Sequence, residues 1–386
     1  YSKEEIDNFL AAFSNFDISM ETLFEVICTC LNDMPAAPDS FSSSEDAANK
    51  ASAGEALRYI LTSWFKQSGA VYEKQHPKFF RTVASFVGSS KDPRINPLKL
   101  MILRNNFDSH EDTSKPFYRS IIEQTKQMKE LPPDDVLFTT KLFKQFPVKE
   151  IADSVTYVMF NIYSNIGPSE LHDGSWQGED RPIRAPHLHL LSVVFNHLAF
   201  LCNVDILFAK NDDDRADVLS KVIELGKIFR KNGNYEGMAA VGGVLGGSSI
   251  ARLKKAWSAL DSKSVKQAKK LEEIVAGLKN YKVYKELAKS TSGPYLPWIA
   301  PKLTELRFLY DGNSKVDDDG NIDYTFLQQA GYSINNYLQF NQTKISALGL
   351  SESQEIIAIL EDVTLFDVNI VDDKLYEQSL KVQPLK

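Results

Sequence analysis

The sequence predicts an all-α protein. Apolar residues recur every three to four positions over long stretches, which is the pattern of a helix with one buried face. The clearest run places Val218, Val222, Leu225 and Phe229 at helical spacing, and it stops at residues 232–234, Asn-Gly-Asn, a typical helix C-terminal signal. The alternation of apolar and polar residues that marks a strand is hard to find anywhere in the chain.

Composition limits the class of protein. The chain has 386 residues, of which 43% are hydrophobic and 25% charged, so it has room for two ordinary soluble domains. Its formal net charge of −7 disfavours nucleic acid as the main partner. The three cysteines, Cys28, Cys30 and Cys202, cannot build a disulfide framework. We find no signal peptide and no apolar run long enough to cross a bilayer, so we expect a cytoplasmic protein.

The chain divides into three segments. In residues 1–87 the sequence predicts three helices. The first carries an apolar stripe around Phe9, the second is capped by Ser19 and runs through Leu31, and the third runs from Leu57 to Phe65. Residues 34–53 are rich in Pro, Ser, Ala and Asp and predict a flexible loop inside this segment. Residues 88–145 form a connector that is partly helical, for example over residues 117–131. Residues 146–386 form the second, mainly helical domain.

Several motifs that resemble catalytic or metal sites fail on inspection. The glycine-rich run over residues 242–249 lacks the lysine of a phosphate-binding loop, so we interpret it as a bend where two helices approach closely. Residues 317–322 resemble the middle of a calcium loop without carboxylates at its two ends. His187 and His189 lie two residues apart and cannot share a metal on a helix. We therefore expect no metal, no cofactor and no covalent chemistry.

A set of short motifs in one order resembles the Ras-family guanine-nucleotide exchange factors, as a divergent member. The matching segments of the second domain are residues 169–176, 195–198, 205–207, 215–216, 233–235, 252–257, 294–313 and 373–381. The strongest is Pro294-Tyr-Leu-Pro297 followed by Leu303-Thr-Glu-Leu306 and Asp311-Gly-Asn313. In the first segment, the apolar stripe and the helix that contains Trp64 resemble the Ras exchanger motif.

The resemblance implies an exchanger-motif domain over residues 1–87 and a catalytic domain over residues 146–386 similar to that of Son-of-sevenless. The catalytic domain would carry a protruding hairpin of two helices, from about Trp298 to Tyr310 and from about Tyr324 to Phe340, that displaces the first switch segment of a Ras-subfamily GTPase. The residues implied for this action are Thr304, Glu305, Arg307, Phe308, Asp311 and Asn313. Asp311 stands where the family carries a glutamate, and its carboxylate would occupy the space of a phosphate.

The resemblance also implies a pocket for the second switch of the GTPase. Its residues would be Asn196, Ala239, Leu245, Gly246, Ser248, Tyr281 and Trp298. Aromatic anchors often carry interface energy, but Trp298 between two prolines is equally expected to fill the core. Leu303 and Leu306 are interpreted as core residues.

Departures from the family leave two alternatives open. Ala239 replaces a larger aliphatic residue, Gly246 replaces a polar one, and residues 326–328 replace a basic cluster. A catalytically inactive adaptor that binds a GTPase, or a purely structural helical scaffold, would also fit the sequence. The family resemblance is further compatible with recruitment to a membrane through regions outside this sequence.

Overall fold

The computed structural model describes residues 5, 8–9, 20–32, 56, 59–62, 64–65, 77–89, 98–99, 102, 142–315, 323–341, 343, 345–361 and 368–385. These residues form two compact units. The first unit comprises residues 1–111, 171–174 and 306–336, and the second comprises residues 112–170, 175–305 and 337–386. Within the described ranges the elements are helices, with a single isolated β-bridge between Asn234 and Leu296. The all-α prediction is confirmed.

The first unit contains α2 (Met20–Asn32) and α4 (Pro77–Ser89). The second unit contains α8 (Leu142–Gln145), α9 (Val148–Ser164), η3 (Pro168–Leu171, whose last residue belongs to the first unit), α10 (Arg181–Arg184), α11 (Pro186–Leu207), α12 (Asp212–Asn232), α13 (Tyr235–Gly246), α14 (Ser248–Ala251), α15 (Lys254–Ser258), α16 (Ser262–Val275), α17 (Leu278–Lys289), η4 (Ile345–Leu348), α20 (Gln354–Glu361) and α21 (Val368–Val382). The division between the units falls within α18 (Ile299–Gly312) and within α19 (Tyr324–Leu338).

The first unit has an aromatic core. Phe24 of α2 meets the ring of Phe79 of α4 edge-on, with 5.8 Å between centroids. Trp64 and Phe65 are buried against the same cluster, as expected for the apolar side of the predicted helix from Leu57 to Phe65. The predictions for Ser19, for the loop over residues 34–53 and for the helix over residues 117–131 lie outside the described residues.

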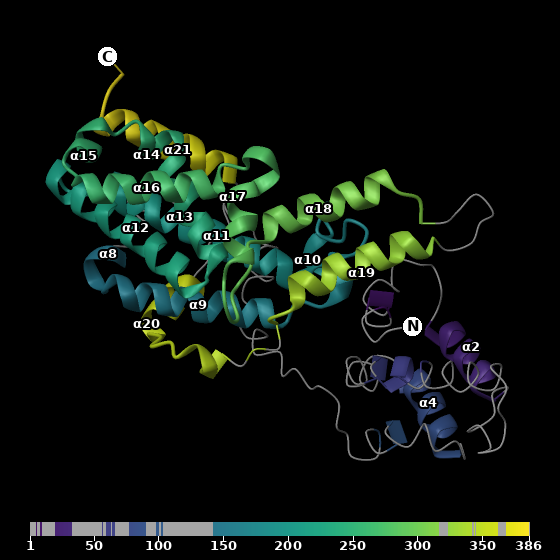
Figure 1. Cartoon of the computed structure of the whole chain (residues 1–386). Helices are drawn as coiled ribbons and strands as arrows, with labels where there is room; N and C mark the ends of the chain where they lie inside the picture. The colour runs from purple at the N-terminus through teal and green to yellow at the C-terminus, as the bar shows by residue number, and fades with distance from the viewer. Residues whose placement is uncertain are drawn as a thin grey trace. The chain divides into compact units, whose positions relative to one another are not determined.

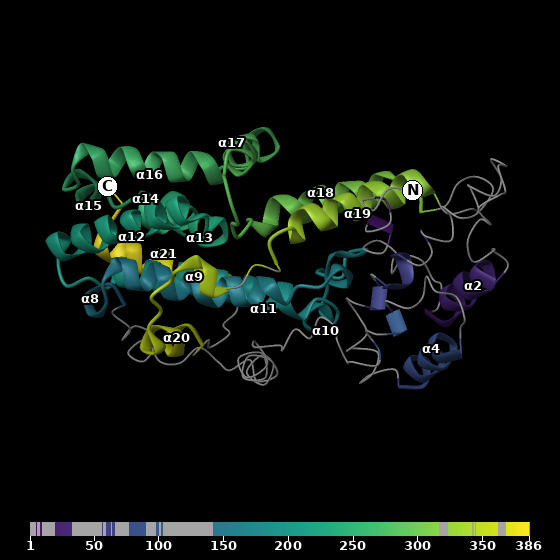
Figure 2. The ribbon, with the colours of Figure 1, turned by 60° about the horizontal axis from the view of Figure 1, so that its bottom comes forward.

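The second unit is a layered helical bundle (Figures 1 and 2). Helices α12 and α13 pack on each other and form the middle, with α16 on one side and α9 and α11 on the other. Helix α12 ends at Asn232, followed by Gly233 in the left-handed conformation (φ 74°), as the stop signal predicts. The bundle core runs along α11, whose buried residues lie on every side of the helix.

Helix α11 corrects the prediction that no apolar run in the chain is long enough to cross a bilayer. By length and composition alone its 22 residues are sufficient to cross a membrane, the single helix of this kind in the part of the chain that the structure describes. However, 61% of its most apolar window is buried inside the protein, and it packs against α9, α12 and α13. Its apolar character is therefore accounted for by its central place in a core.

The glycine-rich run over residues 242–249 was interpreted as a bend where two helices approach closely. Residues 242–246 continue α13, and the chain turns only at Gly247. A side chain at Gly242 would approach Val275 of α16 to 2.9 Å, so this glycine permits close packing of the two helices. Gly243 has open space around it. The predicted close approach is found at Gly242, and the bend lies within the run, at Gly247.

Candidate functional site

Helix α18 carries a stripe of side chains that is half-buried at Thr304 and exposed at the three residues that follow. Thr304, Arg307, Phe308 and Asp311 follow one another at intervals of three and four residues, so they lie along one side of the helix. Phe308 is 69% exposed, whereas Leu306, on the opposite side, is fully buried. An exposed aromatic residue on an otherwise packed helix is a feature of interaction surfaces.

Among the described residues, the polar side chains of the stripe and Asn313 contact neighbours on their own helix. The Arg307 guanidinium lies 3.4 Å from the Asp311 carboxylate, and both side chains are 66% exposed. A pair this exposed contributes little to stability, so both charges can be redirected to a partner. The Thr304 hydroxyl donates to the Ala300 carbonyl, and the Asn313 amide donates to the Leu309 carbonyl. Both of these bonds serve the helix itself.

Glu305 lies beside this stripe on α18. Its carboxylate accepts a hydrogen bond from Lys302 at 2.9 Å, and its side chain is 42% exposed. Lys302 is only 12% exposed, so this pair ties Glu305 to the flank of the helix. The six predicted hairpin residues thus fall on the last two and a half turns of α18 and the residue that follows it.

Within the first unit, α19 packs on the outer half of α18. Figures 1 and 2 show the two helices side by side, and the ring of Tyr310 meets that of Phe326 with centroids 5.5 Å apart. The opposite edge of α19 contacts the N-terminal segment, where Asn335 donates to Asn8 at 3.0 Å. A side chain at Gly331 would come within 2.0 Å of the Asn8 carbonyl oxygen. Only glycine allows this approach without a shift of the segment.

The start of α18 is held inside the second unit. The backbone N–H of Trp298 donates to the Tyr284 hydroxyl at 2.8 Å. The N–H of Ile299, the first residue of the helix, donates to the Glu236 carboxylate at 2.9 Å. Trp298 is 8% exposed and its ring meets those of Tyr281 and Tyr284 edge-on. The arrangement agrees with the core interpretation of Trp298.

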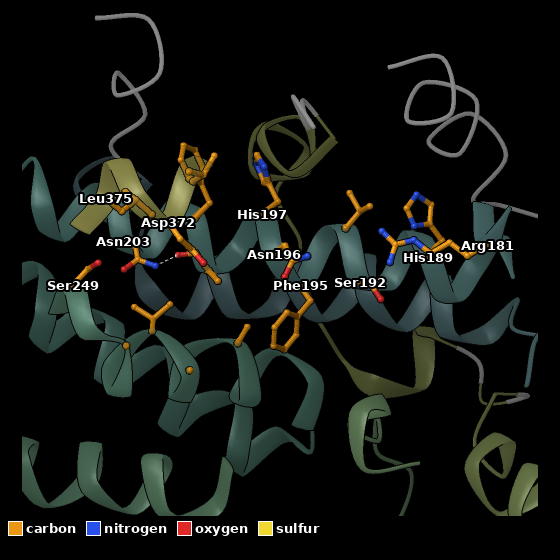
Figure 3. Close-up of a pocket in the computed structure, with 18 of the residues that line it drawn as sticks. Arg181, His189, Ser192, Phe195, Asn196, His197, Asn203, Ser249, Asp372 and Leu375 are labelled. Atoms are coloured by element: carbon orange, nitrogen blue, oxygen red, sulfur yellow. Dashed lines mark hydrogen bonds between the residues drawn. The ribbon is translucent and has the colours of Figure 1, made fainter. Parts of the chain in front are cut away.

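A separate groove of about 860 Å³ lies within the second unit. One face of α11 forms its floor, and α10, α13, α14 and α21 line the remainder (Figure 3). Asn196 and Ser248 line this groove. These two predicted partner-binding residues therefore line one groove.

His189 lines the same groove at its α10 end (Figure 3). Its two ring nitrogens are buried and have no hydrogen-bond partner among the described residues. Burial, assisted by the nearby Arg181 charge, lowers the pKa of His189 to about 4, so the ring is neutral at physiological pH. At this end of the groove an uncharged imidazole therefore lies near the charged side chain of Arg181.

The other predicted partner-binding residues lie elsewhere. Ala239 and Leu245 are 2% and 0% exposed, so they support α13 from inside the core. Gly246 is exposed, and a side chain there would meet only Glu272, at 3.8 Å. Partner contact by these residues stays a prediction.

Tyr281 lies in an unusual backbone segment. Residues 279, 280 and 281 have φ angles of 51°, 55° and 58°, in the left-handed region that costs an L-residue about 1–2 kcal/mol. Strain of this kind is often kept at functional sites. The turn presses the Tyr281 ring against Trp298, with 5.1 Å between centroids, and leaves the neighbouring Leu278 72% exposed.

Two of the motif segments named above, residues 169–176 and 233–235, hold the starts of helices α11 and α13. The Glu170 carboxylate is 4% exposed and accepts hydrogen bonds from the N–H groups of His187 and Leu188 at 2.8 and 3.0 Å, which fixes the start of α11. The Asn234 side chain caps α13 through the Gly237 N–H at 2.8 Å. His187 also contacts Glu170 through its ring, at 2.7 Å. In the described ranges no cluster of three His, Cys, Asp or Glu residues is arranged to hold a metal.

Sequence reasoning missed Glu236 and the exposed tyrosines of α19. Glu236 is 1% exposed, and its only sequence signal was an acidic residue inside an otherwise apolar helix. Tyr332 is 57% exposed and Tyr324 is 43% exposed. Their signal was a large aromatic on the polar side of a helical repeat.

Comparison with known proteins gives concordant matches. Residues 150–328 match the RasGEF domain. The chain is 23% identical over 325 residues to Ras-specific guanine nucleotide-releasing factor 2 of Mus musculus, covering 84% of this chain and 26% of that protein. It is 28% identical over 223 residues to Ras guanine nucleotide exchange factor R of Dictyostelium discoideum, covering 58% of this chain and 12% of that protein. The chain therefore spans about a quarter or less of the length of these relatives.

Proposed function

We propose, on the premise that residues 150–328 are a divergent RasGEF domain, that this chain is a guanine-nucleotide exchange factor for a Ras-family GTPase. The observation that carries the proposal is the exposed stripe of α18. It joins an aromatic residue, Phe308, to a weakly held ion pair, Arg307 and Asp311. These side chains are available to a partner without unfolding any part of the protein.

The α18 stripe would act on the first switch and the phosphate site. A GTPase holds its nucleotide through Mg²⁺, the backbone of its phosphate-binding loop and a lysine. Phe308 would pack under the displaced switch. The Asp311 carboxylate, once released from Arg307, would bond the groups that normally hold phosphate. Thr304, Glu305 and Asn313 would line the contact beside them.

The groove of the second unit would hold the second switch. Its floor offers Asn196 as a hydrogen-bonding group, and Ser248 lies on its wall. Tyr281, partly exposed and rigidly supported by Trp298, would add an aromatic anchor. Ala239 and Leu245 would serve this surface indirectly, by fixing α13 beneath it.

The mechanism is a competition between two ligands of the GTPase. Nucleotide binds such GTPases with about −15 kcal/mol, so spontaneous release is slow. A protein that binds the nucleotide-free form more tightly weakens nucleotide binding by the same factor, through linkage. No covalent bond is made or broken in this scheme, and no cofactor is needed.

Release of fluorescent GDP from a panel of Ras-subfamily GTPases tests the proposal. We expect acceleration of release from at least one member, increasing with the concentration of this chain. Unchanged release from every member, with the chain shown to be folded, would refute it. A melting curve of the same preparation provides the folding control.

One observation favours a second candidate function, that of an inactive adaptor which binds a GTPase. Ala239 and Leu245 contribute no exposed side chain, and Gly246 has none, so the surface around the groove has few gripping groups. Stable binding to a GTPase without any change in nucleotide release would favour the adaptor. In either case, recruitment to a membrane would depend on regions outside this sequence.

A further inference from the structure

A buried carboxylate holds the first residue of the hairpin helix. Glu236 lies in the first turn of α13 and is 1% exposed. Its Oε2 atom accepts a hydrogen bond from the Ile299 N–H at 2.9 Å. Glu236 and Ile299 are 63 residues apart in sequence, so this bond ties α18 to a different helix of the same unit.

The contact answers a structural need of α18. The first N–H groups of any helix lack partners within that helix, and inside a protein they must find other acceptors. Here the Trp298 N–H uses the Tyr284 hydroxyl and the Ile299 N–H uses Glu236. Helix α18 runs from Ile299 to Gly312, so these two bonds hold the first turn of the helix that carries Arg307, Phe308 and Asp311.

We propose that Glu236 is a positioning residue for nucleotide exchange, which anchors the base of the hairpin and makes that anchoring dependent on pH. Only the nucleotide-release test of this proposal rests on the proposed exchange function. Glu236 does not touch the partner. It acts through the placement of α18.

The pH dependence follows from burial. Loss of solvation raises the pKa of Glu236 to about 8, and the hydrogen bond from Ile299 opposes this increase only in part. The groups that respond to its charge are the phenols of Tyr284 on α17 and Tyr337 on α19. Burial raises the pKa of each phenol too, so both stay neutral. Glu236 is therefore the group in this contact that titrates near neutral pH.

The direction of the effect is set by linkage. Any opening that exposes the Glu236 carboxyl lowers its pKa from about 8 to the ordinary value of about 4.5. Between these two values, each unit of increase in pH raises the ratio of open to closed form about tenfold, because the open form loses a proton that the closed form keeps. Above pH 8 both forms are ionised and the dependence levels off. The anchor is therefore firmest in mild acid.

Amide hydrogen exchange tests the anchor without any GTPase. In the wild-type chain, the protection factor of the Ile299 amide, corrected for intrinsic exchange, should fall about tenfold per unit between pH 6 and pH 8. In Glu236→Gln it should be independent of pH, because the amide oxygen still accepts the bond but does not titrate. A wild-type protection factor as constant as that of Glu236→Gln would overturn the proposal.

A matched control exists in the same unit. The Asp205 carboxylate is also buried and accepts a hydrogen bond from a helix-start N–H, that of Phe143 in α8, at 2.9 Å. Asp205→Asn should leave the protection of Ile299, and its pH dependence, as in the wild type. If Asp205→Asn abolishes the pH dependence at Ile299, the effect belongs to the whole fold and the Glu236 proposal fails.

Nucleotide release provides the second arm. With a GTPase that responds to the wild type, Glu236→Ala should reduce the maximal release rate at least tenfold, and Glu236→Gln should recover most of it. Equal rates for Glu236→Ala and wild type would overturn the positioning role. If no GTPase responds to the wild type, the exchange function fails, while the hydrogen-exchange arm still decides the anchor.

Discussion

The most informative single substitution is Phe308→Ala. Phe308 is 69% exposed in the free protein, so its truncation removes little packing within the protein itself. Full burial of a phenylalanine side chain is worth about 1.5–3 kcal/mol. About two-thirds of that, roughly 1–2 kcal/mol, would be gained only on contact with a GTPase. Since about 1.4 kcal/mol is a factor of ten, kcat/KM for GDP release should fall about five- to thirtyfold.

Leu306→Ala is the matched comparison on the same helix. Leu306 is fully buried, so its truncation should cost about 2–5 kcal/mol of folding stability. Stopped-flow release of fluorescent GDP gives kcat/KM, and thermal unfolding gives Tm for both variants. We expect Phe308→Ala to keep the wild-type Tm and Leu306→Ala to lower it. A Phe308→Ala protein with a wild-type exchange rate and a lowered Tm would refute the assignment of this residue to the interface.

Three further predictions follow from other contacts. The double variant Arg307→Ala, Asp311→Ala should slow GDP release but change stability by less than about 1 kcal/mol in urea unfolding, because the pair is exposed. Gly331→Leu should destabilise the N-terminal contact by about 1–3 kcal/mol or more, since Asn8 leaves no space, and faster proteolysis of residues 1–20 would report it. Glu236→Gln should unfold at higher urea than wild type at pH 8 but not at pH 4.5. The raised pKa makes wild-type stability fall by about 5 kcal/mol across that range.

Each of these three predictions has one result that would contradict it. Wild-type release by the folded Arg307, Asp311 double variant would remove both charges from the mechanism. Unchanged proteolysis of Gly331→Leu would mean that the Asn8 contact does not hold the segment. Parallel pH profiles of wild type and Glu236→Gln would show that Glu236 does not titrate in this range.

The hairpin and its limits were implied by the family resemblance, and local sequence signals agree with them. Prolines precede its first helix, a glycine ends it, and the apolar spacing is regular between them. The predicted limits, Trp298 to Tyr310 and Tyr324 to Phe340, differ from α18 and α19 by no more than two residues at each end. Of the two leucines interpreted as core residues, Leu306 is buried, whereas Leu303 is only half-buried.

The support beneath the hairpin was not predictable in this way. Helix α13 is apolar on almost every side, so periodicity does not separate Ala239 and Leu245, which are buried, from residues that face a groove. The same helix absorbs most of the glycine run, because packing on α16 favours helix over the local preference for a bend. The role of Glu236 depends on Ile299, which only the folded chain brings beside it.

The central claim is that this chain prefers a GTPase with an empty nucleotide site. Its most direct test is the affinity for one responsive GTPase in two states, nucleotide-free and loaded with GDP, measured by surface plasmon resonance. We predict a stable complex with the nucleotide-free form that dissociates when GDP is added. Equal affinity for the two forms would contradict the account, because a ligand that does not distinguish them cannot change nucleotide binding.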